Sequence, residues 1–303
     1  EDARGRSGRY GLEGAFDPLL SGTTGFRESE LDPRGRWIVF GARTGTHAAN
    51  GADLLLTIDR TLQLETCRQL ELAVTDAKAA GGIVIIMHPV TGAIRAMCSI
   101  PSFDPNRYQE TTDLARFSAP AVTAAYEPGS VFKAITMAAA LDAGAVEPGT
   151  HFVDTGSVTL NGEKITNTDG MVYGERTMAD VLRFSINTGA VFVARTLGID
   201  RFRAAVERFG FGTRTDVELA GEVPGNTSSL AAREEIYLAT GSFGQGITVT
   251  PLQLAVAYAA LANGGKLISP YLVEEVLAAD GTRRRTEPRV VRQVVSARTA
   301  TLL

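Results

Sequence analysis

The sequence predicts an α+β fold, in which an antiparallel sheet is flanked by helices. The prediction depends on two observations. Short apolar runs of strand length occur in neighbouring pairs that are joined by turn residues, as in antiparallel hairpins. Several stretches with helical periodicity lie between and after these pairs. At roughly 150 residues per domain, 303 residues suggest two domains, or one large domain with an appendage.

Residues 1–50 are rich in Gly and Arg and hold few periodic apolar positions. A short helix over 15–20 and a strand over 37–40 are expected there. This is too little core to fold alone, so the segment is interpreted as part of a smaller domain or as a module packed against something larger.

A helix and an antiparallel hairpin are expected after residue 53, where the apolar pattern becomes regular. Asp59 is predicted to cap the helix, and Gly81 and Gly82 to end it. The predicted elements are a strand over 54–58, a helix over 61–78 and two strands over 83–87 and 93–99.

Asn161-Gly162 predicts a second hairpin, because this pair favours a two-residue turn. Thr250 is expected to cap a later helix that has Pro251 at its first position. The other predicted elements are helices over 130–143, 177–184, 188–197 and 201–209, and strands over 271–277 and up to 291 around a turn at 280–281. Residues 283–285, three arginines, are interpreted as a solvated hairpin edge.

Composition excludes several classes of function. The chain has 30 Lys+Arg against 34 Asp+Glu and no basic tract, so it lacks the footprint of a nucleic-acid binder. No apolar run reaches about 18 residues, and the first residues lack a signal-peptide pattern. Cys67 and Cys98 fit no metal-binding spacing and are expected to be small buried apolar residues without a disulfide framework. The scattered His47, His88 and His151 favour neither a metal site nor histidine catalysis.

One lysine stands in an otherwise apolar helical stretch. From Val131 to Leu141, Lys133 is the only charged side chain. Such a helix is expected to be buried, and a buried ammonium is costly unless it is paired or loses its proton. Ser130, three residues earlier, lies on the same helix face. A neutral or hydrogen-bonded lysine beside a serine can activate that serine as a nucleophile without histidine.

Pro128-Gly129 places Ser130 at a helix N-terminus, where free backbone N–H groups can stabilise a developing oxyanion. A second interpretation stays open, because Ser-x-x-Lys is common by chance and lysines often extend from half-buried helices to solvent. Residues 241–246 match no phosphate-binding pattern and are interpreted as backbone turns near the site.

Ser185 and Asn187 flank a break between two helical stretches. From a tight turn, both side chains could reach one cleft, where they would relay a proton and hold a substrate amide. The alternative is that one of them only caps the following helix.

These segments together resemble the penicillin-binding transpeptidases of class B, the monofunctional type. Ser130-Val131-Phe132-Lys133 resembles the family's first motif and Ser185-Ile186-Asn187 its second. Other segments resemble family landmarks in the expected order, and the resemblance covers nearly the whole chain. They are residues 8–13, 57–63, 91–97, 101–106, 209–212, 243–246 and 250–253.

The resemblance implies a transpeptidase domain of the serine β-lactamase-like fold over 51–303, preceded by part of a pedestal, dimerisation-like module over 1–50. The family's third motif, Lys-Thr/Ser-Gly, is absent from the sequence, and the family has it soon after a segment like 296–303. The domain is therefore expected to stop before that motif, and the isolated chain is expected to be inactive. His88 stands where the family usually has an acidic residue and is interpreted as an exposed turn residue.

The implied activity is that of a D,D-transpeptidase that cross-links peptidoglycan stem peptides. Ser130 would be the nucleophile, Lys133 its base, Ser185 a proton relay and Asn187 an anchor for the donor amide. β-Lactams would acylate Ser130. No metal and no organic cofactor are expected, and nucleic acid is not an expected partner.

The resemblance also implies a setting. Expected partners are a polytopic membrane glycosyltransferase of the SEDS type and divisome proteins, because residues 126–130 resemble the division-type subgroup more than the elongation type. The chain would be the extracytoplasmic part of a single-pass membrane protein whose anchor lies outside it.

Two other functions remain as alternatives. The first is a penicillin-recognising sensor or a wall-synthesis scaffold without turnover, which the missing third motif favours and the intact Ser-x-x-Lys and Ser-x-Asn pair disfavours. The second is a serine β-lactamase, in which the segment over 8–50 has no place. Rapid release of the acyl group would indicate a β-lactamase, and long retention a transpeptidase or sensor.

Overall fold

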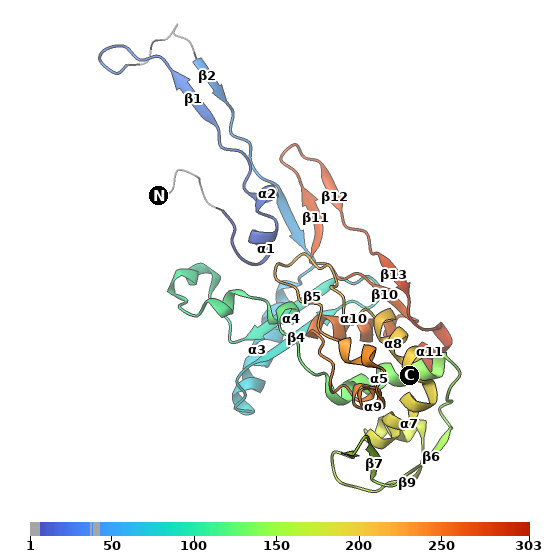
Figure 1. Cartoon of the computed structure of the whole chain (residues 1–303). Helices are drawn as coiled ribbons and strands as arrows, with labels where there is room; N and C mark the ends of the chain where they lie inside the picture. Colours follow the sequence, from blue (N-terminus) through green and yellow to red (C-terminus); the bar gives the residue numbers. More distant parts are fainter. Residues whose placement is uncertain (1–6, 37, 39–42) are drawn as a thin grey trace. The chain divides into compact units, whose positions relative to one another are not determined.

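The computed structural model describes residues 7–36, 38 and 43–303, and the chain divides into two compact units (Figure 1). The smaller unit comprises Glu1–Thr57, Glu218–Ala220 and Leu272–Glu287. The larger unit comprises Ile58–Val217, Gly221–Tyr271 and Pro288–Leu303. Each unit is described by itself.

Among its described residues, the smaller unit holds two antiparallel sheets, one of order β1-β2 and one of order β12-β11-β3. The arginines of β12 are exposed at a sheet edge, as predicted, and Arg283 and Arg285 pair with glutamates of β11. The predicted strand over 37–40 falls largely outside the described residues. The elements are α1 (Gly11–Ala15), α2 (Asp17–Leu20), β1 (Phe26–Ser29), β2 (Arg43–Thr46), β3 (Asp53–Leu56), β11 (Val273–Leu277) and β12 (Arg283–Arg285).

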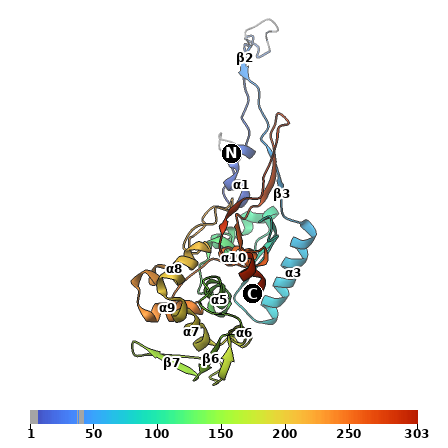
Figure 2. The same ribbon diagram turned by 90° about the vertical axis from the view of Figure 1, so that its right-hand side faces the viewer.

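The larger unit combines four antiparallel strand pairs, β4-β5, β6-β9, β7-β8 and β10-β13, with helices, so the predicted α+β class is confirmed (Figures 1 and 2). Its strands are β4 (Gly82–Met87), β5 (Ile94–Ile100), β6 (His151–Asp154), β7 (Ser157–Leu160), β8 (Glu163–Thr166), β9 (Gly174–Thr177), β10 (Lys266–Ile268) and β13 (Val290–Gln293). Its α-helices are α3 (Arg60–Asp76), α4 (Pro120–Thr123), α5 (Lys133–Asp142), α6 (Met178–Arg183), α7 (Asn187–Leu197), α8 (Ile199–Arg208), α9 (Glu235–Ser242), α10 (Pro251–Ala262) and α11 (Ala297–Leu302). Its 3₁₀ turns are η1 (Pro105–Glu110), η2 (Leu114–Phe117), η3 (Gly129–Phe132) and η4 (Ser228–Ala232).

Local sequence signals determine several element ends as predicted. Asp59 caps α3 by accepting a hydrogen bond from the Leu62 backbone N–H. Thr250 and Gln253 form a reciprocal capping box at the start of α10. The Asn161-Gly162 turn has positive φ at both residues, which is the geometry of a type I′ hairpin turn.

The two cysteines correct the sequence prediction. Cys67 on α3 and Cys98 on β5 form a disulfide, with their Cα atoms 5.5 Å apart. Their expected state as unbonded apolar residues was therefore wrong. The Gln63 side chain, one helical turn before Cys67, exchanges two hydrogen bonds with the backbone of Met97, which holds α3 on the strand. This packing brings the cysteines together, and a spacing of 31 residues does not reveal it.

Helix α5 lies at the centre of the helical part of the larger unit, where α6, α7, α8 and α11 contact it (Figure 2). Its middle is almost wholly buried, as its apolar composition predicts. The stretch predicted as one helix over 130–143 is divided, because η3 forms a 3₁₀ turn before the α-helix begins at Lys133.

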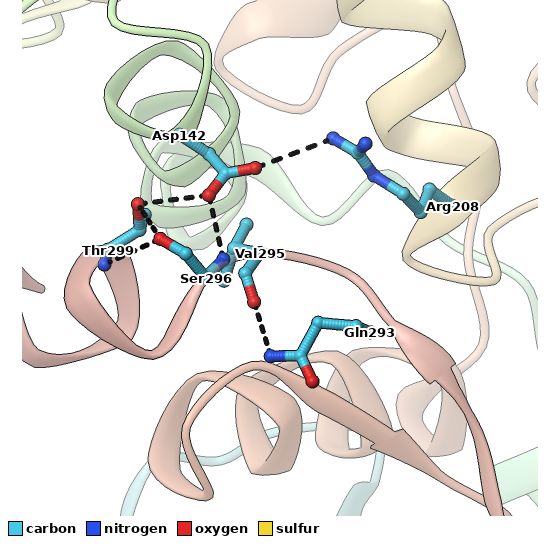
Figure 3. Close-up of polar contacts among 6 residues, drawn as sticks. All are labelled: Asp142, Arg208, Gln293, Val295, Ser296 and Thr299. Atoms are coloured by element: carbon cyan, nitrogen blue, oxygen red, sulfur yellow. Dashed lines mark hydrogen bonds and ion pairs between the residues drawn. The ribbon is translucent and has the colours of Figure 1, made fainter.

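The far end of α5 is tied to the last part of the chain (Figure 3). The Asp142 carboxylate accepts hydrogen bonds from the Ser296 backbone N–H at 2.7 Å and the Thr299 hydroxyl at 3.1 Å. Its second oxygen lies 4.0 Å from a guanidinium nitrogen of Arg208. Ser296 in turn caps α11. One carboxylate thus joins α5, α8 and α11.

Candidate active site

Ser130 and Lys133 lie next to each other at the start of the buried helix. Ser130 belongs to η3 and is exposed, whereas Lys133, the first residue of α5, is 3% exposed. The Lys133 Nζ donates to the Ser130 Oγ at 3.2 Å. The i,i+3 spacing therefore brings an accessible hydroxyl to a buried amine.

The turn between α6 and α7 brings two further predicted residues to the same amine. Lys133 Nζ lies 3.0 Å from the Ser185 Oγ, 2.5 Å from the Ser185 carbonyl oxygen and 2.7 Å from the Asn187 Oδ1. Ser185 has φ +54°, a left-handed conformation that costs a non-glycine residue free energy and is concentrated at functional sites. All four predicted site residues thus meet at one nitrogen.

Burial controls the charge of Lys133. Removal from water lowers the pKa of this amine from 10.5 to about 8. Its hydrogen-bond partners are two hydroxyls, a carbonyl and an amide oxygen, all of them uncharged. A neutral amine holds a lone pair that can accept the Ser130 hydroxyl proton, so the geometry and the pKa both suit a general base.

A backbone turn packs directly against the Ser130 segment. The Gly244 carbonyl accepts a hydrogen bond from the Gly129 N–H at 3.0 Å, and a Cβ at Gly244 would lie 2.3 Å from the Gly129 oxygen. Gly244 also has φ +78°, which favours glycine. The prediction that residues 241–246 form turns near the site is confirmed for residues 243–246, but it was wrong for Gly241 and Ser242, which are the last residues of helix α9. Glu127, which the sequence did not single out, accepts from the Gly246 N–H at 2.8 Å.

The β7-β8 hairpin supplies residues that the sequence analysis missed. The Asn187 Nδ2 donates to the Thr166 carbonyl at 2.9 Å and to the Thr168 Oγ1 at 3.3 Å. A cavity of about 460 Å³ opens beside Asn187, between β8 and α9, and Lys164, Thr240 and Gln245 also line it. A separate cavity of about 280 Å³ over residues 102–116 contains none of the four predicted site residues. Of these two cavities, the larger one therefore adjoins the site, at Asn187.

The described residues offer neither a metal site nor a membrane-spanning helix. No group of three or more His, Cys, Asp or Glu side chains in the described ranges could hold a metal ion. Within the same residues, no helix is long and apolar enough to cross a lipid bilayer. His88 lies in an exposed turn, where its ring accepts from the Thr91 N–H, in agreement with the interpretation of this residue.

Comparison with known families gives one match that covers most of the chain. Residues 82–303 match the penicillin-binding protein transpeptidase domain. The matched segment includes Ser130, Lys133, Ser185 and Asn187.

Individual relatives are similar along almost the full chain. The chain is 33% identical over 296 residues to stage V sporulation protein D of Bacillus subtilis, covering 97% of this chain and 46% of that protein. It is 33% identical over 288 residues to peptidoglycan D,D-transpeptidase FtsI of Escherichia coli, covering 95% and 48%. The chain thus spans about half the length of these curated relatives.

A solved structure has the same fold. Penicillin-binding protein 3 of Mycobacterium tuberculosis, in a crystal structure with ampicillin, superposes with a TM-score of 0.82 at 27% sequence identity. The superposition covers 97% of this chain and 61% of that chain. Its coverage of this chain extends beyond the segment of the family match.

Proposed function

The chain belongs to the family of penicillin-binding protein transpeptidase domains, and on this basis we propose that it is part of a serine D,D-transpeptidase that cross-links peptidoglycan stem peptides. One observation carries the proposal: a buried amine, Lys133 Nζ, lies within hydrogen-bond distance of Ser130, Ser185 and Asn187. If the Ser-x-x-Lys pattern had arisen by chance, there would be no reason for the second motif to contact the same amine. That motif comes from more than fifty residues further along the chain.

In the proposed acylation step, the Ser130 Oγ attacks the carbonyl carbon between the two terminal D-alanines. Its proton passes to the neutral Lys133 amine, which becomes an ammonium. The C–N bond then breaks, and the leaving D-alanine nitrogen takes a proton from Lys133 through the Ser185 hydroxyl. An ester on Ser130 remains, and Lys133 is neutral again.

In the second step, an amine of a neighbouring stem peptide attacks the ester carbonyl. Lys133 takes a proton from that amine, the C–O bond to Ser130 breaks, and Lys133 returns the proton to the Ser130 oxygen. A new amide, the cross-link, has formed. Asn187 would hold the donor peptide's amide beside the cavity that its side chain lines. The same attack on the strained amide of a β-lactam opens the ring and leaves a stable adduct on Ser130.

The setting is proposed by analogy with the relatives. We assign this chain to an extracytoplasmic domain of a membrane-anchored protein, acting with a SEDS-type membrane glycosyltransferase and divisome proteins. A division role is supported by the name of the Escherichia coli relative, FtsI. The domain division remains a prediction, with a pedestal module over 1–50 and a transpeptidase domain over 51–303 that lacks the third motif.

Covalent labelling tests the proposed nucleophile. Ser130→Ala should abolish labelling of the chain by a fluorescent penicillin, read after denaturing electrophoresis, because it removes the proposed nucleophile, the exposed hydroxyl three residues before Lys133. Ser118→Ala, which removes an exposed hydroxyl outside the site, should label normally. Persistent labelling of the Ser130→Ala variant would overturn the assignment.

The release of the label separates the three candidate functions. Long retention fits a transpeptidase or a sensor, and rapid appearance of penicilloate would replace the proposal with a β-lactamase. Formation of a cross-linked dimer from stem-peptide donors and acceptors would exclude a sensor without turnover.

A further inference from the structure

A buried carboxylate beneath the Ser-x-Asn turn has no part in the mechanism above. Asp154, the last residue of β6, is 2% exposed. Its Oδ1 accepts from the Thr188 hydroxyl at 2.6 Å and the Gly156 N–H at 2.8 Å. Its Oδ2 accepts from the Asn167 Nδ2 at 2.9 Å and the Tyr173 N–H at 2.7 Å.

Four neutral donors therefore surround this carboxylate. A buried charge is costly unless hydrogen bonds or an opposite charge compensate it. Burial raises the pKa of Asp154, but hydrogen bonds from Thr188, Tyr173, Gly156 and Asn167 outweigh it, so the pKa lies below its usual value. A negative charge here also lies against the first turn of α7, where the helix dipole favours it.

Asp154 reaches Asn187 by two routes. In the first, Thr188, which donates to Asp154, directly follows Asn187 in the first turn of α7. In the second, Asn167 donates to Asp154, and its neighbours Thr166 and Thr168 accept both hydrogen bonds from the Asn187 Nδ2. The Thr188 N–H donates to the Asn167 Oδ1 at 3.2 Å and closes the loop.

This arrangement determines which way the Asn187 amide faces. A backbone carbonyl can only accept, so the Nδ2 must point to Thr166. The Oδ1 is then directed to the Lys133 Nζ, 2.7 Å away. If the segment over 166–168 or the start of α7 moved, the amide would lose this orientation, and the wall of the adjoining cavity would move with it.

We propose that Asp154 is a positioning residue for the active site: by holding Asn167 and Thr188, it orients the Asn187 amide toward Lys133 and shapes the wall of the substrate cavity. The carboxylate contacts both segments that flank the Asn187 side chain, through Asn167 on one and Thr188 on the other. The effect of Asp154 on acylation rests on the proposed function, whereas its effect on Asn187 does not.

Asp154→Asn tests the proposal by placing an NH₂ group where two donors converge. We expect the second-order rate constant for acylation by a fluorescent penicillin to fall at least tenfold in the folded variant. The matched control is Asp180→Asn, the same substitution in the capping box of α6. This control should lower the melting temperature while the acylation constant stays within twofold of the parent value.

Thr188 provides a second pair of variants in case Asp154→Asn does not fold. Thr188→Val keeps the shape and removes the donated hydrogen bond, so acylation should fall about tenfold. Thr188→Ser keeps the hydroxyl and should restore most of the rate. Equal rates in the two Thr188 variants, or normal acylation by folded Asp154→Asn, would overturn the proposal.

A nuclear magnetic resonance measurement gives a readout besides activity. In protein labelled with ¹⁵N at asparagine, the Asn187 side-chain amide signal, assigned by its loss in Asn187→Ala, should shift or split in Asp154→Asn or Thr188→Val, and not in Asp180→Asn. An unmoved signal would overturn the proposal even if acylation fell. If the parent protein is not acylated at all, the proposed function fails, and this signal still decides the role of Asp154.

Discussion

The two sides of the Lys133 amine are built by different physical means. On one side, Ser130 lies three residues away, and the apolar helix α5 and the backbone turn at Gly244 hold it in place. On the other side, Ser185 and Asn187 come from a turn 52 and 54 residues further along the chain. That side is held by hydrogen bonds, many of which lead to Asp154.

The two sides should therefore tolerate different kinds of substitution. Apolar packing is non-directional, so the helix side should be sensitive to added volume and to backbone strain. A hydrogen-bond network is directional, so the turn side should be sensitive to a single lost or reversed donor. The following variants test this contrast.

The largest effect is expected at Lys133, whose amine contacts both sides. Lys133→Met should lower the acylation constant about 1,000-fold, within the range for loss of a general base. The free energy of unfolding should change little, because relief from burying an amine offsets the hydrogen bonds that Ser185 and Asn187 lose. Lys266→Met, at an exposed lysine of β10, is the control and should keep the parent rate. A Lys133→Met rate within tenfold of the parent would exclude this residue as the base.

The pH dependence follows from the same amine. Because the pKa of Lys133 is about 8, acylation by the parent protein should rise about tenfold per pH unit below 8 and level off above it. The residual rate of Lys133→Met should lack this rise. Between about 8 and 10.5 the unfolded state binds the proton that the folded state has lost, so the contribution of Lys133 to stability should increase with pH there. A parent rate independent of pH from 6 to 9 would contradict the assignment.

A smaller effect is expected on the helix side. Gly244→Ala adds a Cβ that would lie 2.3 Å from the Gly129 oxygen, at a residue with φ +78°. We expect a loss of about 2–4 kcal/mol in unfolding free energy, measured in urea, with slower acylation as the Ser130 segment shifts. Gly281→Ala has a similar φ, +84°, but open space around it, so it should cost about 1 kcal/mol and leave acylation unchanged. Equal losses of unfolding free energy in the two variants would mean that the positive φ, and not the close approach to Gly129, determines the cost.

The smallest effect is expected at the far end of α5. Asp142→Asn keeps an oxygen that can accept from Ser296 and Thr299 and loses only the 4.0 Å approach to the partly exposed Arg208 (Figure 3). We expect a loss of about 0.5 kcal/mol in the free energy of unfolding and slightly faster amide hydrogen exchange in α11. Acylation should not change, in contrast to Asp154→Asn. A large drop in acylation would mean that the contact at the end of α5 also controls the site.

Sequence reasoning located the local features well, because each depends on residues close together in the chain. The caps at Asp59 and Thr250, the Asn161-Gly162 turn and the Ser130–Lys133 contact are of this kind. The prediction that the two cysteines are unbonded was wrong, since the pairing of Cys67 with Cys98 depends on how α3 packs on β5. Thr166 and Thr168 were missed because they contact Asn187, about twenty positions away, through a backbone carbonyl and a common hydroxyl. No sequence pattern indicates such contacts.

By itself, the sequence determined an α+β chain with a lysine inside an apolar helix and a serine on the same helix face, because periodicity and i,i+3 geometry are local properties. Only the tertiary structure decided that Ser185 and Asn187 reach that lysine, that burial lowers its pKa, and that the Asp154 carboxylate orients the Asn187 amide. Each of these depends on contacts between segments far apart in the chain. The free energy of such contacts comes from the packing of the whole unit.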